Sequence, residues 1–175
     1  MSEESDGDDE SAAGAPEGSE TETLAVDADD LAGIVDLFGA LAPAELRKAL
    51  AELAFKRGVD TPPDTVVEEA VASYHLVEYD GLLVVGPAAF PTLPENAADL
   101  PHILDVTHET PPTEAVARAA EQRFREEAAR ALGPGEGVED ASTVERLVDV
   151  SYDLEAWGPV DVREVRQRLD DAGPD

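Results

Sequence analysis

The sequence predicts a mainly helical protein that contains one β-hairpin. Apolar residues recur at the spacing of amphipathic helices before residue 75 and again after residue 112. Between these regions the spacing becomes that of a strand on either side of Asp80-Gly81, a pair favoured in two-residue type I′ turns. We therefore expect a three-helix unit with a hairpin, followed by a C-terminal helical extension.

Three helices are expected before the hairpin, over residues 27–38, 43–57 and 62–74. Asp27 or Asp29 can cap the first helix, and Gly39 ends it. Pro43 suits the first turn of the second helix, which Gly58 closes. The third helix follows two prolines and carries acidic residues on its outer face. The spacing of the apolar residues gives each helix one buried face.

The hairpin is expected to pair residues 75–79 with residues 82–85. Leu76 and Glu78 share one face of its first strand, Val77 and Tyr79 share the other, and the second strand is apolar on both faces. A strand that is apolar on both faces must be covered on both. The helices can cover one face, and the other needs the segment around Phe90 and Leu93, the C-terminal helices or a partner chain.

Residues 86–112 contain six prolines and are expected to form an irregular strap, with a turn of helix near residues 96–100. So long a connection is either functional or a linker. Three helices should follow, the first capped by Thr113, the second beginning at Ser142 or Thr143, and the third over residues 160–169. The predicted organisation is a disordered acidic tail over 1–23, a first domain with the strap over 24–110, and a helical segment over 111–175.

The order of elements in the first domain resembles a winged-helix domain, in which the third helix packs beside the hairpin. Four segments, LAGIVDLFGAL, LVEYDGLLVVGPAAFPTLP, DLPHILDV and VDVSYDLEAWGPVDV, resemble a haloarchaeal family of small acidic proteins of unknown function. The resemblance covers residues 24–170 and implies no functional residue, because none is assigned in that family.

The charge of the chain indicates adaptation to molar salt. The sequence holds 41 acidic and 12 basic residues, a formal net charge of -29, and its only lysines are Lys48 and Lys56. The acids are spread along the whole chain, with nine against no bases in residues 1–26, 16 against four in 27–111, and 16 against eight in 112–175. At ~1 M salt the Debye length is about 3 Å, so repulsion between these carboxylates is largely screened. We therefore expect a protein of a halophilic archaeon, surrounded by solvent cations.

Several function classes find no support in the sequence. The chain has no cysteine, which excludes disulfides and thiolate chemistry, and it has neither a glycine-rich phosphate loop nor a nucleophile elbow. The first ten residues lack the bases and apolar run of a secretory signal, and no apolar stretch approaches the ~18 residues of a membrane span. A cytoplasmic protein without a cofactor, and without enzymatic activity, is the simplest expectation.

Two polar clusters contain side chains that could form metal or acid-base sites. His102, Asp105 and His108, with Glu109 beside them, could bind zinc, but their spacing matches no ligand motif, and local hydrogen bonding explains them as well. A second cluster lies near the sole tryptophan: Asp149, Tyr152, Asp153, Glu155 and Trp157. Its carboxylates are typical of a solvated helix face, and Trp157 is typical of an apolar contact at a helix end. His75, at the junction of helix and strand, is expected to be a packed or surface histidine and not a catalyst. We predict no metal site and no catalytic residue.

The distribution of basic residues argues against nucleic acid as a partner. The third helix exposes Asp64, Glu68 and Glu69 and no base, whereas DNA-binding proteins depend on phosphate contacts. Four pairs of Glu and Arg four residues apart neutralise the C-terminal helices: Glu114–Arg118, Glu121–Arg125, Glu126–Arg130 and Glu164–Arg168. Arg123, Arg146, Arg163 and Arg166 have no obvious partner.

We therefore expect a non-catalytic protein interaction module that binds another protein or a second copy of itself. The residues expected to contact a partner are Tyr79, Leu83, Val85 and Phe90, with Leu83 pointing outward. The alternative is a winged-helix DNA-binding transcriptional regulator. Its contacts would come from Arg47, Lys48, Lys56 and Arg57.

Overall fold

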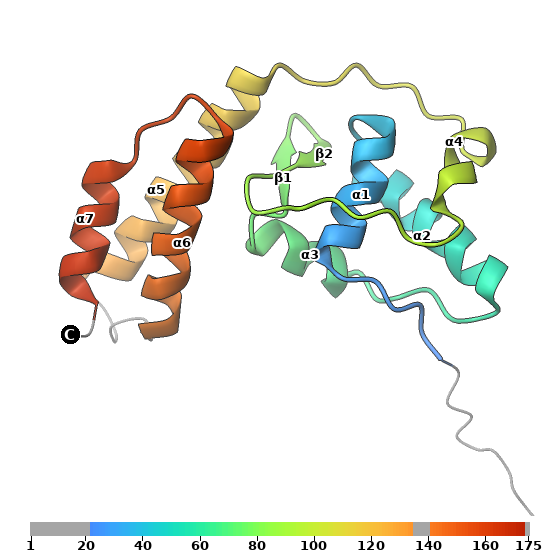
Figure 1. Cartoon of the computed structure of the whole chain (residues 1–175), viewed down its shortest axis with the longest axis horizontal. Coiled ribbons are helices and arrows are strands. Elements are labelled where there is room, and N and C mark those ends of the chain that lie inside the picture. Colours follow the sequence, from blue (N-terminus) through green and yellow to red (C-terminus); the bar gives the residue numbers. More distant parts are fainter. Residues whose placement is uncertain (1–21, 135–140, 174–175) are drawn as a thin grey trace, which may run out of the picture.

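The structure is a computed structural model that describes residues 22–134 and 141–173. Within this part the chain forms two groups of elements that lie side by side (Figure 1). The N-terminal unit consists of α1 (Ala28–Phe38), α2 (Pro43–Arg57), α3 (Thr65–Ala72), β1 (Leu76–Tyr79), β2 (Leu82–Val85), a 3-10 turn (Ala97–Asp99) and α4 (Leu100–Ile103). The C-terminal bundle consists of α5 (Thr113–Leu132), α6 (Ala141–Trp157) and α7 (Arg163–Ala172). The prediction of a mainly helical protein with one hairpin and a C-terminal helical part is confirmed.

Carboxylates fix the starts of the first two helices. The Asp27 side chain accepts a hydrogen bond from Asp30 N at 2.8 Å, and the Asp30 side chain accepts one from Asp27 N at 3.1 Å, which satisfies two donors at the start of α1. Glu45 reaches back in the same way and accepts from Ala42 N at 2.8 Å. Gly39 ends α1 and Gly58 ends α2, as the sequence predicts.

The hairpin has the register and turn that the sequence predicts. β1 and β2 are antiparallel, with Leu76 opposite Val85 and Tyr79 opposite Leu82, and both Asp80 and Gly81 have positive φ angles, as a type I′ turn requires. The sequence does not reveal that Leu41, between α1 and α2, also pairs with β2. Leu41 and Leu83 exchange two backbone hydrogen bonds of 3.1 and 2.7 Å, so β2 has a partner on each side at this point.

The hairpin lies between two hydrophobic cores. One face of it, with Leu76 and Leu83, belongs to the core of α1, α2 and α3, and the other, with Val77, belongs to the core of the bundle. Helix α5 packs directly against β1. The second face of the hairpin is therefore covered by the C-terminal helices.

The strap, residues 86–112, first crosses α1 and then extends over the top of the molecule to α5 (Figure 1). Thr92 fixes the crossing, since its N–H donates to Asp29 O at 3.0 Å and its hydroxyl to Asp30 Oδ1 at 2.7 Å. The strap lies so close to α1 that a Cβ atom on Gly33 would be 1.8 Å from Thr92 O. This position therefore requires glycine.

Several predicted boundaries differ from the structure. α3 begins at Thr65 and ends before Tyr74, which has a φ of 64° and turns the chain into β1. Thr113 is the first residue of α5 and makes no side-chain cap. Order begins before Asp27, because Thr23 pairs with Asp60 and Leu24 is buried. α6 begins at Ala141, and α7 spans Arg163–Ala172 instead of residues 160–169. The predicted disordered tail falls almost wholly on residues outside the described ranges.

Candidate functional site

The structure separates the four residues expected to contact a partner. Leu83 is 1% exposed and lies in the N-terminal core, so the expectation that it points outward is wrong. Leu83 lies opposite Glu78 in the hairpin, on the face of the hairpin that packs against the helices of the N-terminal unit. Tyr79 and Val85 are half-buried and pack against the bundle core and the N-terminal core, respectively. Phe90 remains, with 79% of its surface exposed.

Phe90 is held in this exposed position by α1. The N–H of Phe90 donates to Asp29 Oδ1 at 2.8 Å, and two residues later Thr92 makes its hydrogen bonds to Asp29 and Asp30. Leu93 follows and is 50% exposed. The strap therefore presents two large apolar side chains to solvent on a backbone that three hydrogen bonds attach to a helix.

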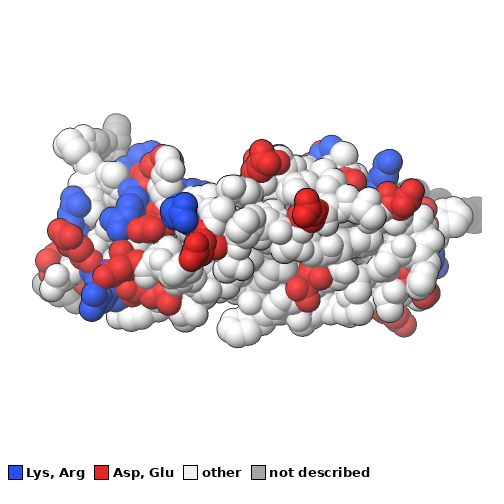
Figure 2. All heavy atoms as spheres, turned by 90° about the horizontal axis from the view of Figure 1, so that it is seen from above, with Lys and Arg blue, Asp and Glu red and all other residues white. Residues whose placement is uncertain are grey.

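Exposed large apolar side chains are concentrated in the N-terminal unit. Of the five in the described part of the chain, Phe55, Phe90, Leu93 and Ile103 belong to this unit, and Tyr152 belongs to the bundle. Tyr152 is also covered by a cation, since the Arg166 guanidinium lies 4.2 Å from the centroid of its ring. Figure 2 shows the matching difference in charge: side chains of both signs are interleaved over the bundle, whereas this face of the N-terminal unit carries fewer of them.

Glu127 of α5 joins the bundle to the N-terminal unit. Its carboxylate accepts hydrogen bonds from Tyr74 Oη at 2.9 Å, Arg123 Nε at 3.0 Å and Arg146 Nη2 at 3.2 Å. The Arg123 guanidinium also lies 4.2 Å from the centroid of the Tyr74 ring. Burial, together with the nearby Glu127 carboxylate, raises the pKa of the Tyr74 hydroxyl, so this group stays a hydrogen-bond donor. We call these four residues the junction clamp.

The junction clamp also caps α3. Arg123 Nη1 donates to Val71 O at 2.6 Å, and Arg146 Nη1 donates to Ala72 O at 3.4 Å. Carbonyl groups in the last turn of a helix lack partners within the helix and carry partial negative charge, which two guanidinium groups offset. The C-terminal end of α3 therefore faces the bundle.

The predicted ion pairs of the bundle form in part. Glu121 binds Arg125 at 2.9 Å, Glu114 lies 3.8 Å from Arg118, and the other two predicted pairs are not within 4.0 Å. The four arginines without an obvious partner in the sequence all have one in the structure, and the partners are Glu127 for Arg123 and Arg146, Asp161 for Arg163, and Glu155 for Arg166. Three of these pairs were missed because they join different elements or run from Arg to Glu, the reverse of the orientation favoured in isolated helices.

The histidines of the strap do not assemble a metal site. No group of three or more His, Asp or Glu side chains suited to a metal ion exists among residues 22–134 and 141–173. His108 instead lies 2.6 Å from Glu45 Oε1, at the start of α2. Although burial raises the pKa of Glu45, the hydrogen bonds from Ala42 N and His108 outweigh it and bring that pKa below its ordinary value.

The carboxylates near Trp157 are likewise not gathered into one site. Glu155 pairs with Arg166 and accepts a 3.3 Å hydrogen bond from Val162 N, which ties α6 to the start of α7. Burial and the neighbouring Asp149 raise the pKa of Asp153. Trp157 is half-buried against the bundle core, where α6 ends.

His75 lies at the start of the hairpin beside a serine and a carboxylate. Ser73 Oγ is 2.7 Å from His75 Nδ1 and also donates to Ala70 O, and His75 Nε2 is 3.6 Å from Asp29 Oδ1. The Ser73 hydroxyl is thus engaged with the last turn of α3. The arrangement joins α3, the hairpin and α1.

Comparison with known proteins places the chain in one family. A model described as a family of unknown function (DUF7109) matches residues 29–174. The chain belongs to this family. No curated protein and no solved structure matches it. The match leaves out residues 1–28 and includes both the N-terminal unit and the bundle. None of the helices in the described residues is long and apolar enough to cross a membrane.

Proposed function

We propose that this protein is a non-catalytic protein interaction module whose N-terminal unit contacts the partner and whose bundle supports that unit. The observation that carries the proposal is the strap: Phe90 and Leu93 are exposed on a backbone held by Asp29 and Asp30. An apolar side chain that is already fixed in place loses little conformational freedom on binding, which favours association. Aromatic residues are also common among the side chains that dominate binding energy.

We further propose that the N-terminal unit is winged-helix-like. The order α1, Leu41, α2, α3 and hairpin supports this, because the short pairing of Leu41 with β2 adds a third strand position between the first two helices. The packing of α3 against α1 and β1 is also consistent with that arrangement.

The alternative of a winged-helix DNA-binding regulator finds less support. The exposed carboxylates of Asp64, Glu68 and Glu69 accompany α3, and its C-terminal end is occupied by the arginines of the junction clamp. Of the bases that the alternative requires, Arg57 lies 2.7 Å from Glu95 and Lys56 lies 4.0 Å from Asp99. A helix with this charge has little to offer a phosphate backbone.

The acidity supports a cytoplasmic origin in a halophilic archaeon as a further part of the proposal. Residues 27–175 hold 32 acids and 12 bases, so repulsion across the folded surface should grow as the Debye length increases in dilute buffer. We expect the circular dichroism signal and the Trp157 emission to change as KCl is lowered from molar to tens of millimolar. Signals that stay constant over this range would contradict the halophilic origin.

The interaction function can be tested by affinity capture at high salt from the organism that encodes the chain. Three tagged proteins are compared: the wild type, Phe90→Asp, and Tyr152→Asp as a control that removes an exposed ring from the bundle. We expect the wild type and the Tyr152→Asp protein to capture the same partner and the Phe90→Asp protein to lose it. Equal capture by all three, with circular dichroism confirming that each is folded, would contradict the proposal.

A further inference from the structure

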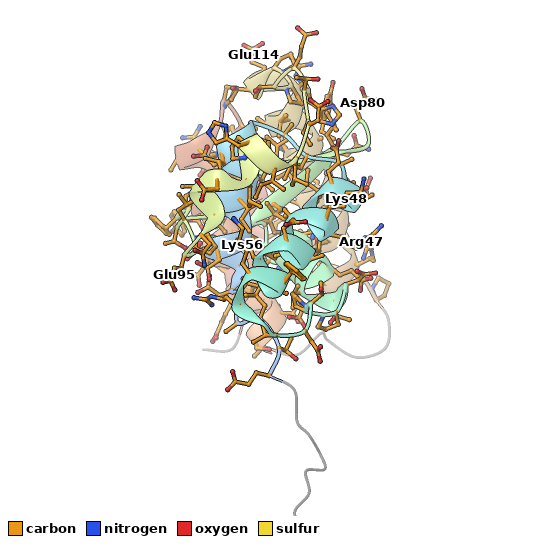
Figure 3. The ribbon with its side chains drawn as sticks, turned by 90° about the vertical axis from the view of Figure 1, so that its right-hand side faces the viewer. Arg47, Lys48, Lys56, Asp80, Glu95 and Glu114 are labelled. Atoms are coloured by element: carbon orange, nitrogen blue, oxygen red, sulfur yellow. The ribbon has the colours of Figure 1, made fainter. Side chains whose placement is uncertain are left out.

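The outer face of α2 carries both basic and apolar side chains, in a unit whose other charged residues are acidic. All four basic residues before Arg118 belong to this helix, and they include both lysines of the chain. Figure 3 views the unit from the side of α2 and shows Arg47 and Lys48 on one side of the helix and Lys56 on the other. An acidic molecule of this kind presents few places where another carboxylate-rich surface can approach closely.

A continuous stripe runs along this face. Its members are exposed side chains four, three and four residues apart, namely Ala44, Lys48, Ala51 and Phe55. This is the spacing of the residues that face a second helix in a coiled coil. Phe55 is 82% exposed, and the two alanines leave room for a helix backbone to come near. The opposite face of α2 holds the residues buried in the core, so the helix is apolar on two sides.

The cations along the stripe are only weakly engaged within the molecule. Lys48 lies within 4 Å of no carboxylate in the described part of the chain, and Arg47 is 3.8 Å from Asp64 in a pair whose side chains are 50% and 62% exposed. An exposed pair of this kind contributes at most ~1 kcal/mol, so Arg47 can exchange Asp64 for a carboxylate of a partner. One carboxylate, Glu52, lies half-buried at the other edge of the stripe.

We propose that the stripe Ala44, Lys48, Ala51 and Phe55 docks an amphipathic helix of a partner protein that carries an apolar seam flanked by carboxylates. The inference rests on the proposed interaction function and specifies a second contact surface and the chemistry of its partner. A second copy of this chain fits less well, because its α2 presents the same exposed Arg47 and Lys48 and only the half-buried Glu52, and so does not offer carboxylates on both sides of the stripe. Nucleic acid would leave Phe55 and both alanines without an apolar contact.

The probe for the test is a fluorescent synthetic peptide of about three heptads, with Leu at the seam positions and Glu at the flanking ones. Its binding to the full-length protein is measured by anisotropy in ~1 M KCl, where the chain is expected to be folded. We expect the wild type to bind, with Kd rising at least ~10-fold for Phe55→Asp and at least ~3-fold for Lys48→Glu. Lys56→Glu, the same change beside Asp99 and off the stripe, should alter Kd less than ~2-fold.

Four results would overturn the inference. The first is that the wild type does not bind the peptide, and the second is that Phe55→Asp and Lys48→Glu bind it as tightly as the wild type does. The third is that duplex DNA displaces the peptide. The fourth is that the wild type sediments as a dimer that Phe55→Asp dissociates. The Phe90→Asp protein should bind the peptide as the wild type does. If the peptide test fails while Phe90→Asp still loses its partner in affinity capture, only this inference falls, and the proposed function stands.

Discussion

The two parts of this protein use charge in different ways. In the N-terminal unit, four carboxylates bind backbone N–H groups, namely those of Asp27, Asp29, Asp30 and Glu45. Among the described residues, its ion pairs with Arg and Lys are three exposed ones. In the bundle, carboxylates mainly bind arginines, as Glu121, Glu127, Glu155 and Asp161 do. The N-terminal unit, with 16 acids against four bases in residues 27–111, thus keeps most of its acidic charge unneutralised and exposes most of the large apolar side chains, whereas arginines of the bundle bind several of its carboxylates. This contrast is why we assign contact with a partner to the first part and support to the second.

The largest expected effect tests how tightly the strap is attached to the N-terminal unit. Replacing Gly33 by Ala would normally stabilise a helix by ~1 kcal/mol. Here the new Cβ atom would lie 1.8 Å from Thr92 O, so we expect the free energy of unfolding to fall by about 3 kcal/mol. Denaturant unfolding at high salt measures the loss, and hydrogen exchange should show faster exchange at the Phe90 and Thr92 amides. A variant as stable as the wild type would mean that the strap does not lie on α1.

The next effect tests the connection between the two parts. Glu127→Ala removes the shared acceptor of Tyr74, Arg123 and Arg146, and the Glu127 side chain is 16% exposed. We expect a loss of about 2 kcal/mol, because buried donors are left without an acceptor while the arginines remain partly hydrated. The loss should appear in thermal unfolding as a less cooperative transition. Glu126→Ala is the matched control, since Glu126 is exposed and, within the described ranges, accepts a hydrogen bond only from Gln122.

These contacts show where sequence reasoning succeeds and where it stops. The ends of α1 and α2 and the turn at Asp80-Gly81 follow from residues within a few positions of one another, and the sequence predicts them. Leu83 pairs with Leu41, which lies between α1 and α2. The cap of α3 depends on Arg123, which is 52 residues from Val71 in the sequence. Such pairings arise only when the whole chain is folded, so periodicity and local spacing do not reveal them.

The candidate site divides along the same line. Phe90 is expected to contact a partner because it lies in the segment next to the hairpin, one face of which needs a further cover, and it is exposed in the structure. The structure removes Leu83 from that surface and adds Leu93 beside Phe90. The position of both residues depends on hydrogen bonds to α1 that join residues 61 and 62 apart, which no sequence pattern encodes.

The smallest of the three stability effects concerns the capping carboxylate of α2. Glu45→Gln keeps an acceptor for Ala42 N but removes the charge that His108 and the helix N-terminus stabilise, so we expect a loss of about 1 kcal/mol at neutral pH. The pKa of Glu45 is lower in the folded protein, so its contribution is fully present above the ordinary carboxyl pKa and disappears as the pH falls through the lowered value. The stabilities of wild type and variant should therefore converge in acid. A constant difference between wild type and Glu45→Gln at all pH values would contradict this explanation.

The division of labour between the two parts can be measured by photo-cross-linking in the cells that encode the protein. A benzophenone side chain is placed at Phe90 in one protein and at Tyr152 in another, since the native side chains are 79% and 57% exposed. We expect position 90 to form a cross-link to a specific second protein and position 152 to form none. A cross-link from position 152 with none from position 90 would contradict the assignment of the partner surface to the N-terminal unit.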